Sequence, residues 1–140
     1  MRYYLSLGAN IGEREVTLRR AIEKIEQQIG HVLRCSSFFY SAPWGFESEN
    51  AFCNLCCVVE TDLQPMEMLS AIQAIERSLG RTHKSVNGQY FDRNIDIDII
   101  LATDEKGKEI HISTPTLTIP HPLYLQREFV TIPLSEIYPA

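Results

Sequence analysis

The sequence lacks the features that would direct a protein to a membrane or out of the cell. Its 140 residues contain no run of about 18 apolar residues, so no membrane-spanning helix is expected. The first residues, MRYYLSLGAN, have neither the basic flank nor the long apolar stretch of a signal peptide. We therefore expect a cytoplasmic protein that makes no contact with a membrane.

Positive charge is also scarce. The chain has 13 Lys and Arg residues against 18 Asp and Glu residues, which gives a net charge of −5 at pH 7. Proteins that coat nucleic acids need an excess of cations, because contacts with phosphates supply most of their affinity. The charge balance therefore argues against a nucleic-acid partner, and we expect a monomer that acts on small molecules.

No internal repeat, low-complexity tract or linker rich in Pro, Gly and Ser divides the chain. A chain of this length suits one domain and buries roughly 68% of the surface that its unfolded form exposes. The hydrophobic content of 44% is ordinary for a globular protein. We expect one domain over residues 1–140, with no second enzyme appended to it.

The four cysteines do not form a recognisable metal-binding pattern. Cys53 and Cys56 have a C-x-x-C spacing, but they lie in the apolar run AFCNLCCVVE, which predicts a buried strand. Residues three apart on a strand point to opposite faces, and no second pair of ligands has a matching spacing. We expect reduced cysteines that pack as small apolar side chains.

Apolar periodicity predicts strands and helices in a simple order. Strands are expected at 3–7, 32–40, 52–61 and 95–101, and helices at 13–29 and 65–79. The turn TDEKGK should lead to a further short strand at 110–112, and the proline-rich tail should contain additions after the last strand. The order β-α-β-β-α-β predicts a ferredoxin-like α+β sandwich, with an antiparallel-rich sheet and both helices packed on one face.

The strongest chemical signal is the pair Asp96 and Asp98 in the segment RNIDIDII. On a strand the two carboxylates share a face, about 7 Å apart along the backbone, while the isoleucines between them point the other way. Two like charges in an apolar strand are unfavourable without cations, and Mg²⁺ prefers such oxygen ligands. The alternative is an exposed strand face that is merely amphipathic.

A basic stretch precedes this pair in an otherwise acidic protein. Cations that neutralise phosphate charge, together with carboxylates that hold metal ions, are the components of phosphoryl transfer. The stretch is long and polar enough to close over a substrate, although it could equally be a solvated surface loop. Its cationic residues and its one histidine are Arg77, Arg81, His83, Lys84 and Arg93.

Three other segments carry weaker signals. GANIG lacks the spacing of a phosphate-binding loop and predicts a tight turn from strand to helix. His121 and Arg127, in IPHPLYLQREF, could contact phosphates. Trp44, Phe46, Phe52 and Asn54 would suit a planar heteroaromatic ligand, held by stacking and by amide hydrogen bonds. Ordinary packing explains each of these groups as well.

Taken together, these motifs resemble the 6-hydroxymethyl-7,8-dihydropterin pyrophosphokinase family of folate biosynthesis. The resemblance covers nearly the whole chain, in order, through YLSLGANIG, SAPWG, NLCCVVET, IERSLGR, DRNIDIDIIL, IPHPLYLQREFV and PLSEI. It implies a ferredoxin-like fold and the transfer of pyrophosphate from ATP to the pterin hydroxymethyl group, which gives the pterin diphosphate and AMP.

The resemblance also implies roles for individual residues. Asp96 and Asp98 would bind two Mg²⁺ ions, and Arg81 and Arg93 would act with them in catalysis. The residues expected at ATP are Gln73, Glu76, Lys84, Arg93, His121 and Arg127. The residues expected around the pterin are Ser41, Pro43, Trp44, Gly45, Phe52, Asn54 and Phe129.

The segment between Lys84 and Arg93 departs from the family pattern. It is longer by about one residue, and Tyr90 or Phe91 stands where a tryptophan is expected. Phe91-Asp92 replaces a Gly-Pro, and His83 takes the place of a third loop arginine. No general base for the hydroxyl is evident, so metal activation and positioning would have to suffice.

Two other classes of function fit the same residues. A palm-like nucleotidyltransferase or cyclase also uses strand carboxylates, but it needs neither a pterin pocket nor His121. A non-catalytic ligand-binding domain would carry Asp96 and Asp98 as surface charges and would show no dependence on Mg²⁺.

Overall fold

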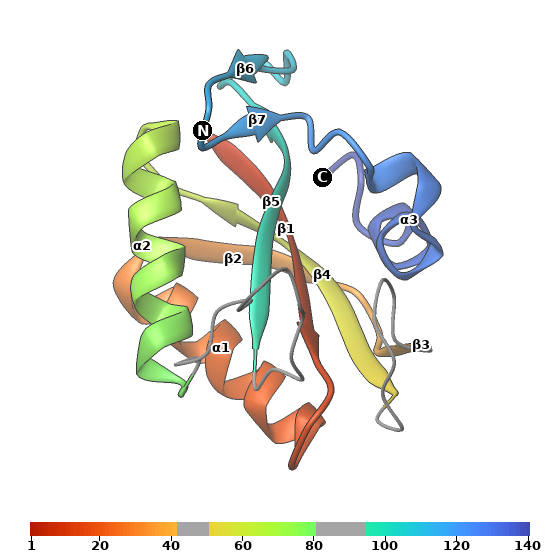
Figure 1. The fold of residues 1–140 in the computed structure, drawn as a ribbon. Coiled ribbons are helices and arrows are strands. Elements are labelled where there is room, and N and C mark those ends of the chain that lie inside the picture. The colour runs from red at the N-terminus through yellow and green to blue at the C-terminus, as the bar shows by residue number, and fades with distance from the viewer. Residues whose placement is uncertain (42–50, 81–94) are drawn as a thin grey trace.

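Five strands form one antiparallel sheet at the centre of the computed structural model, which describes residues 1–41, 51–80 and 95–140 (Figure 1). The central strand β1 pairs with β4 on one side and with β5, an edge strand, on the other. β2 and β3 both pair with the far side of β4. The strands are β1 (Arg2–Ala9), β2 (His31–Cys35), β3 (Phe39–Ser41), β4 (Phe52–Glu60) and β5 (Asp96–Thr103).

Helices cover both faces of this sheet. α1 (Arg14–Gln28) and α2 (Pro65–Ser78) lie on one face, and α3 (Glu128–Ser135) lies on the other (Figure 1). The ferredoxin-like arrangement with α1 and α2 on one face is confirmed, as is the predicted β-α-β-β-α-β order apart from the division of its second strand into β2 and β3. Within the described part of the chain, no helix combines the length and the apolar character that crossing a bilayer would need.

The main core lies between the sheet and the first two helices. α1 contributes Leu18, Ala21 and Ile25, while α2 contributes Ile72 and Ile75, and all five side chains are buried. These buried residues recur at helical spacing, and they belong to the apolar periodicity from which the two helices were predicted. Burying one Leu or Ile side chain stabilises a fold by about 1.5–3 kcal/mol, so these stripes account for the position of the two helices.

A second, smaller core holds α3 against the opposite face. Val130 and Leu134 of α3 pack with Tyr4 of β1, Val58 of β4 and Ile100 of β5. This helix was not predicted from the sequence, because five prolines interrupt the tail after residue 114 and Pro133 lies inside the helix itself. The helical spacing of the apolar residues from 129 to 137 was the available signal.

The single strand predicted at 32–40 is wrong, because the structure divides this segment into β2 and β3. Between β2 and β3, Ser36 and Ser37 interrupt the regular backbone pairing and form other hydrogen bonds. The backbone N–H of Ser36 donates to the Cys56 carbonyl, while its hydroxyl accepts from the Cys56 N–H. Glu136 accepts hydrogen bonds from both the backbone N–H and the hydroxyl of Ser37. These contacts tie the break to the end of the tail.

The hairpin predicted after β5 is only partly correct. The turn is present, and Asp104 closes it by accepting the backbone N–H of Lys106 and of Lys108, each at 2.9 Å. However, the predicted strand at 110–112 forms no continuous ladder with β5: the described contacts are a bridge between Thr103 and Glu109 and the bond from the Ile110 N–H to the Ala102 carbonyl. The chain instead forms β6 (Ile112–Ser113), which pairs with β7 (Thr118–Ile119).

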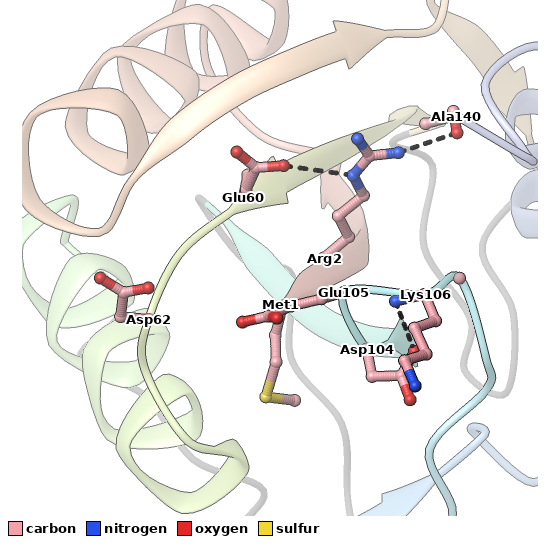
Figure 2. A pocket seen from close by; sticks show the side chains of 9 residues that line it. Met1, Arg2, Glu60, Asp62, Asp104, Glu105, Lys106 and Ala140 are labelled. Atoms are coloured by element: carbon pink, nitrogen blue, oxygen red, sulfur yellow. Dashed lines mark hydrogen bonds and ion pairs between the residues drawn. The ribbon is translucent and has the colours of Figure 1, made fainter.

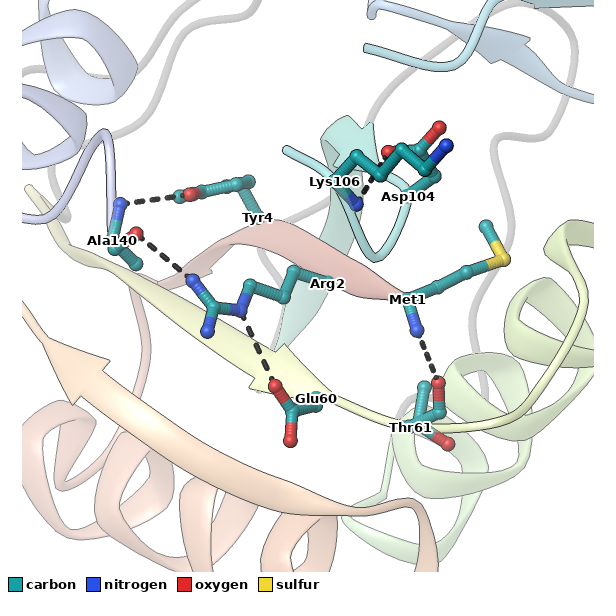
Figure 3. A network of polar contacts seen from close by, with 8 residues as sticks. All are labelled: Met1, Arg2, Tyr4, Glu60, Thr61, Asp104, Lys106 and Ala140. Carbon is teal, nitrogen blue, oxygen red and sulfur yellow. Dashed lines mark hydrogen bonds and ion pairs between the residues drawn. The ribbon is translucent and has the colours of Figure 1, made fainter. Parts of the chain in front are cut away.

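Both chain ends are fastened at the end of the sheet where β1 begins (Figure 3). The N-terminal amine donates to the Thr61 carbonyl at 3.0 Å. The Arg2 guanidinium donates to Glu60 at 3.3 Å and to the Ala140 carbonyl at 2.9 Å. The Tyr4 hydroxyl accepts the Ala140 N–H at 3.0 Å. These hydrogen bonds hold the first and last residues of the chain against the sheet.

The cysteines behave largely as predicted. All four are free thiols, and Cys53, Cys56 and Cys57 are buried. Cys53 and Cys57 lie in the main core, while Cys56 faces the α3 side, so the C-x-x-C pair does point to opposite faces. The prediction that all four cysteines are packed in the core is wrong for Cys35. This residue is exposed, because it is the last residue of β2.

Candidate functional site

One half of the α3-side face of the sheet carries polar side chains and a glycine. On this face β1 carries Tyr4, followed by Ser6 and Gly8. The neighbouring strands β4 and β5 also change from apolar to polar residues along this face, opposite Ser6 and Gly8. Two rows cross the sheet, one joining Asn54, Gly8 and Asp96, the other joining Cys56, Ser6 and Asp98. We call the residues Ser6, Gly8, Asn54, Asp96 and Asp98 the polar face.

Asp96 and Asp98 lie on one face of β5, as the sequence predicts. Both are half-buried, whereas Ile95, Ile97 and Ile99 between and beside them are buried in the main core. The next residue on the carboxylate side, two positions on, is buried under α3. The two carboxylates therefore stand where the cover of α3 ends.

Asn54 is fixed within a small group at the other side of the polar face. Its side chain is only 3% exposed, and its amide donates to the Ser41 hydroxyl at 3.0 Å. A Cβ atom on Gly8 would lie 2.6 Å from the Asn54 carboxamide oxygen and 3.5 Å from the Phe52 ring. Gly8 is therefore required for the close approach of Asn54, and the predicted grouping of Ser41, Phe52 and Asn54 is present.

The outer edge of β5 is held by two of the predicted ATP-site residues. Glu76, on α2, is 7% exposed and accepts the backbone N–H of Ile97 at 2.8 Å. The backbone N–H of His121 donates to the Ile100 carbonyl at 2.9 Å. Asp98 lies between Ile97 and Ile100, the two residues that these bonds hold. Glu76 and His121, which are distant in sequence, therefore both contact β5 close to Asp98.

The Arg127 guanidinium and the imidazole of His121 lie close together on one side of the site. Burial lowers the pKa of His121, and the nearby Arg127 charge lowers it further, while Asp96 acts in the opposite direction. Nδ1 of His121 accepts the Leu123 N–H at 3.2 Å, so a neutral ring carries its proton on Nε2. The Arg127 guanidinium lies 5.7 Å from the centre of the Phe129 ring, which is partly buried at the start of α3.

A cavity of about 270 Å³ runs along the outer edge of β5. Apolar side chains of α2 and of β5 form one wall, and the segment from Pro115 to Pro122 forms another. Asp98 and His121 both line it. The cavity combines these apolar side chains with a carboxylate and an imidazole, which suits a flat base with a charged group attached.

A larger cavity, of about 530 Å³, lies at the opposite end of the sheet beside both chain ends (Figure 2). Its lining includes Arg2, Glu60 and Asp104, which already bond to one another or to nearby backbone groups. Among the described residues, no three His, Cys, Asp or Glu side chains gather there or elsewhere as a ready-made metal site. This cavity therefore offers little to a phosphate or a metal ion.

Several predicted residues are not tested by this geometry. The exposed side chain of Gln73 lines neither cavity. Six further residues lie outside the described ranges: Pro43, Trp44, Gly45, Arg81, Lys84 and Arg93. The described neighbours of these segments, Ser41, Ala51 and Ile95, are at the same end of the sheet as the polar face.

Two residues of the polar face were not predicted from the sequence. Gly8 and Ser6 sit opposite Asp96 and Asp98 in the pairing of β1 with β5. The alternation of LSLGA, with small residues between leucines, was the available signal. It could not be interpreted alone, because the register between β1 and β5 is a long-range property.

Comparison with known proteins agrees with this arrangement. Residues 4–139 match the family model for 7,8-dihydro-6-hydroxymethylpterin-pyrophosphokinase. A 2-amino-4-hydroxy-6-hydroxymethyldihydropteridine pyrophosphokinase of Porphyromonas gingivalis is 44% identical over 97% of this chain and 90% of its own length. The enzyme of that name from Bacillus subtilis is 38% identical over 96% of this chain and 76% of its own length.

Solved structures share the fold. The HPPK-DHPS protein of Plasmodium falciparum superimposes with a TM-score of 0.72 at 19% identity, over 99% of this chain. The match spans only 42% of that longer protein. The family match over nearly the whole chain, together with the carboxylate pair and the Asn54 group on one face, leads to one assignment. The chain belongs to the 7,8-dihydro-6-hydroxymethylpterin-pyrophosphokinase family.

Proposed function

We propose that the polar face is the active surface on which pyrophosphate passes from ATP to the hydroxymethyl group of 6-hydroxymethyl-7,8-dihydropterin. The products are the pterin diphosphate and AMP, and the reaction belongs to folate biosynthesis. The observation that carries the proposal is the placement of Asp96 and Asp98, half-buried and on one face of β5. Asn54 lies in the row of Asp96, two strands away.

Asp96 and Asp98 fit Mg²⁺ by their chemistry. Mg²⁺ is commonly held by one or two carboxylates, with the remaining positions filled by substrate phosphates and water. The two carboxylates on one face of β5 are in line with that pattern. The expected two ions would be shared with the phosphates of ATP. Bound Mg²⁺ would neutralise the charge that develops on the transferred group.

ATP is proposed to occupy the 270 Å³ cavity with its base and to extend toward Asp98 with its phosphates. The apolar side chains of Leu69 and Ile72 would contact the base, and His121 would meet the phosphates. The Nε2–H of His121 is available to donate, because Nδ1 already accepts a hydrogen bond. Arg127 adds a fixed positive charge on the same side.

The pterin is proposed to bind at the Asn54 end of the polar face. A desolvated amide that is already fixed by Ser41 can read the edge of a heterocycle, and it rejects rings that lack matching groups. Phe52 and Phe129 are the described aromatic residues proposed to stack on the ring. Pro43, Trp44 and Gly45 are proposed to complete the pocket.

The chain's own contribution to the reaction is positioning and charge. The row from Asn54 to Asp96 would orient the pterin hydroxyl toward the terminal phosphates of ATP. Arg81, Lys84 and Arg93 are proposed to supply further cations to those phosphates. Such positioning supplies a large part of the rate enhancement in phosphoryl transfer.

Neutral replacements of the two carboxylates test the metal assignment. Asp96→Asn and Asp98→Asn should each lower kcat by at least about a hundredfold at saturating Mg²⁺ and leave the thermal unfolding midpoint unchanged or higher. Asp62→Asn, a change at an exposed site far from the polar face, is the control and should turn over normally. Normal turnover of either site variant, or turnover in excess chelator, would contradict the proposal.

The same assay separates the two other classes of function. A nucleotidyltransferase would consume nucleotide without a pterin, and a binding domain would turn over nothing. A monomeric state and a cytoplasmic location stay predictions from the sequence.

A further inference from the structure

Among the described strands, none forms a ladder with the outer edge of β5, so its backbone groups need other partners. At least three of them bond to described residues. The Ile97 N–H donates to the Glu76 carboxylate, the Ile100 carbonyl accepts the His121 N–H, and the Ala102 carbonyl accepts the Ile110 N–H. Only the first of these bonds comes from a side chain, and only it falls between the two aspartates.

The Ile97 N–H belongs to the peptide unit that joins Asp96 to Ile97. Because that unit is planar, fixing its N–H direction fixes the backbone orientation at both ends. The carboxylates of Asp96 and Asp98 leave the strand one residue before and one residue after Ile97. The pairing with β1 holds the inner edge of this stretch, and the Glu76 bond adds a second constraint from the outer edge, between the two carboxylates.

Glu76 is an unusual side chain for this location. A carboxylate that is 7% exposed is costly to bury unless charge-assisted hydrogen bonds compensate for the lost water. An apolar side chain would fill the same space between α2 and β5 without that cost. Glu76 is placed by α2, which packs directly against β5 (Figure 1), so its reach to the strand is fixed by helix packing.

We propose that Glu76 is a positioning residue for the metal site, acting through the Ile97 backbone on the aim of Asp96 and Asp98. The inference rests on the proposed function to the extent that these aspartates hold the metal ion. It assigns Glu76 a role that does not require contact with ATP. Partners that orient metal ligands in this way typically change metal affinity by about 10–100-fold when they are removed.

Three replacements of Glu76 separate this role from simple packing. Glu76→Gln keeps an oxygen that can accept the Ile97 N–H, whereas Glu76→Ala removes the acceptor. Glu76→Asp keeps the charge but shortens the side chain by one methylene, so its carboxylate falls short of the strand. Glu23→Ala, at an exposed position of α1, is the control for loss of a glutamate.

The measurement is the affinity for Mn²⁺, followed by electron paramagnetic resonance with a non-hydrolysable ATP analogue and the pterin present. We expect Mn²⁺ affinity to fall about 10–100-fold in Glu76→Ala and Glu76→Asp, and to stay within about threefold of the original in Glu76→Gln and Glu23→Ala. The Ile97 amide should exchange with solvent faster in the first two variants only. If Glu76→Ala does not fold, the Asp and Gln variants decide the matter.

Asp98→Asn in the same titration separates the two possible failures. Original Mn²⁺ affinity in Glu76→Ala and Glu76→Asp, beside weakened binding in Asp98→Asn, would overturn the role of Glu76 and leave the metal assignment standing. Original affinity in Asp98→Asn would overturn the metal assignment, and the role of Glu76 with it. Weak binding in Glu76→Gln as well would show that the charge, and not the bond to Ile97, is what matters.

Discussion

Asn54 and Asp96 lie on either side of Gly8 in one row across the sheet, Asn54 on β4 and Asp96 on β5. Neighbouring strands are about 4.8 Å apart, so the backbones of the two residues are separated by roughly 10 Å. Both side chains are on the α3 side. The amide proposed to read the pterin and a carboxylate proposed to hold Mg²⁺ thus face the same space, above a residue that has no side chain.

Gly8→Ala should weaken pterin binding. The new methyl group would meet the Asn54 carboxamide oxygen at 2.6 Å, and the bond from Asn54 to Ser41 would have to break or shift. We expect at least a tenfold loss of pterin affinity, which corresponds to about 1.4 kcal/mol, and a smaller change in ATP affinity, both measurable by calorimetry.

A double replacement identifies the cause of that loss. If the clash with Asn54 is responsible, Gly8→Ala should destabilise the original chain but cost little in an Asn54→Ala background, as thermal unfolding would show. An equal cost in both backgrounds would mean that the added methyl group strains something other than Asn54.

Glu136→Gln should make stability less dependent on pH. Hydrogen bonds from the backbone N–H and hydroxyl of Ser37 lower the pKa of Glu136 from its usual value of 4.5. A lowered folded-state pKa adds stability above the unfolded pKa, and this contribution is lost as the pH falls through the folded value. The variant should therefore unfold at a lower temperature than the original at pH 7, and the difference should shrink as the pH falls below the unfolded-state pKa of the carboxyl group.

The control for this prediction is Glu105→Gln, in the exposed turn after β5. It should change the unfolding midpoint little at either pH. A midpoint difference for Glu136→Gln that is the same at pH 7 and pH 3 would show that the carboxylate charge does not contribute.

Iodoacetamide should modify the native protein at Cys35 alone. Burial raises the pKa of Cys56 to about 12 and that of Cys57 well above its usual value, so neither forms a thiolate near pH 8. Cys53 is buried as well. Cys35 is exposed at the surface, although partial burial of its thiol raises its pKa too. Mass spectrometry should therefore show one adduct that forms slowly, and four adducts after denaturation. Two or more adducts on the folded chain would contradict the packing of β4.

The sequence was sufficient for the parts of the molecule that follow from local pattern. The apolar stripes of α1 and α2 and the alternation through Asp96 and Asp98 are periodic over several residues, and the structure confirms them. α3 was missed because Pro133 argues against a helix, although packing against Tyr4 and Val58 stabilises it. The break after Cys35 depends on Glu136, about a hundred residues away in sequence, and no local pattern reveals it.

In the candidate site, too, local pattern identifies some residues, and long-range contacts determine the rest. The motifs identify Asn54, Asp96 and His121 as chemically important, but they do not show how these residues are held. That Gly8 must lack a side chain follows only from the register of β1 with β4. That Glu76 reaches the Ile97 backbone follows only from the packing of α2 against the edge of the sheet.

Analysis of the nucleotide products tests the central claim most directly. The purified protein would be incubated with ATP, Mg²⁺ and 6-hydroxymethyl-7,8-dihydropterin, and the nucleotides would then be separated. The account predicts AMP that forms only when the pterin is present, in equal amount to the pterin diphosphate and without free pyrophosphate. Formation of ADP, or of AMP without the pterin, would contradict it.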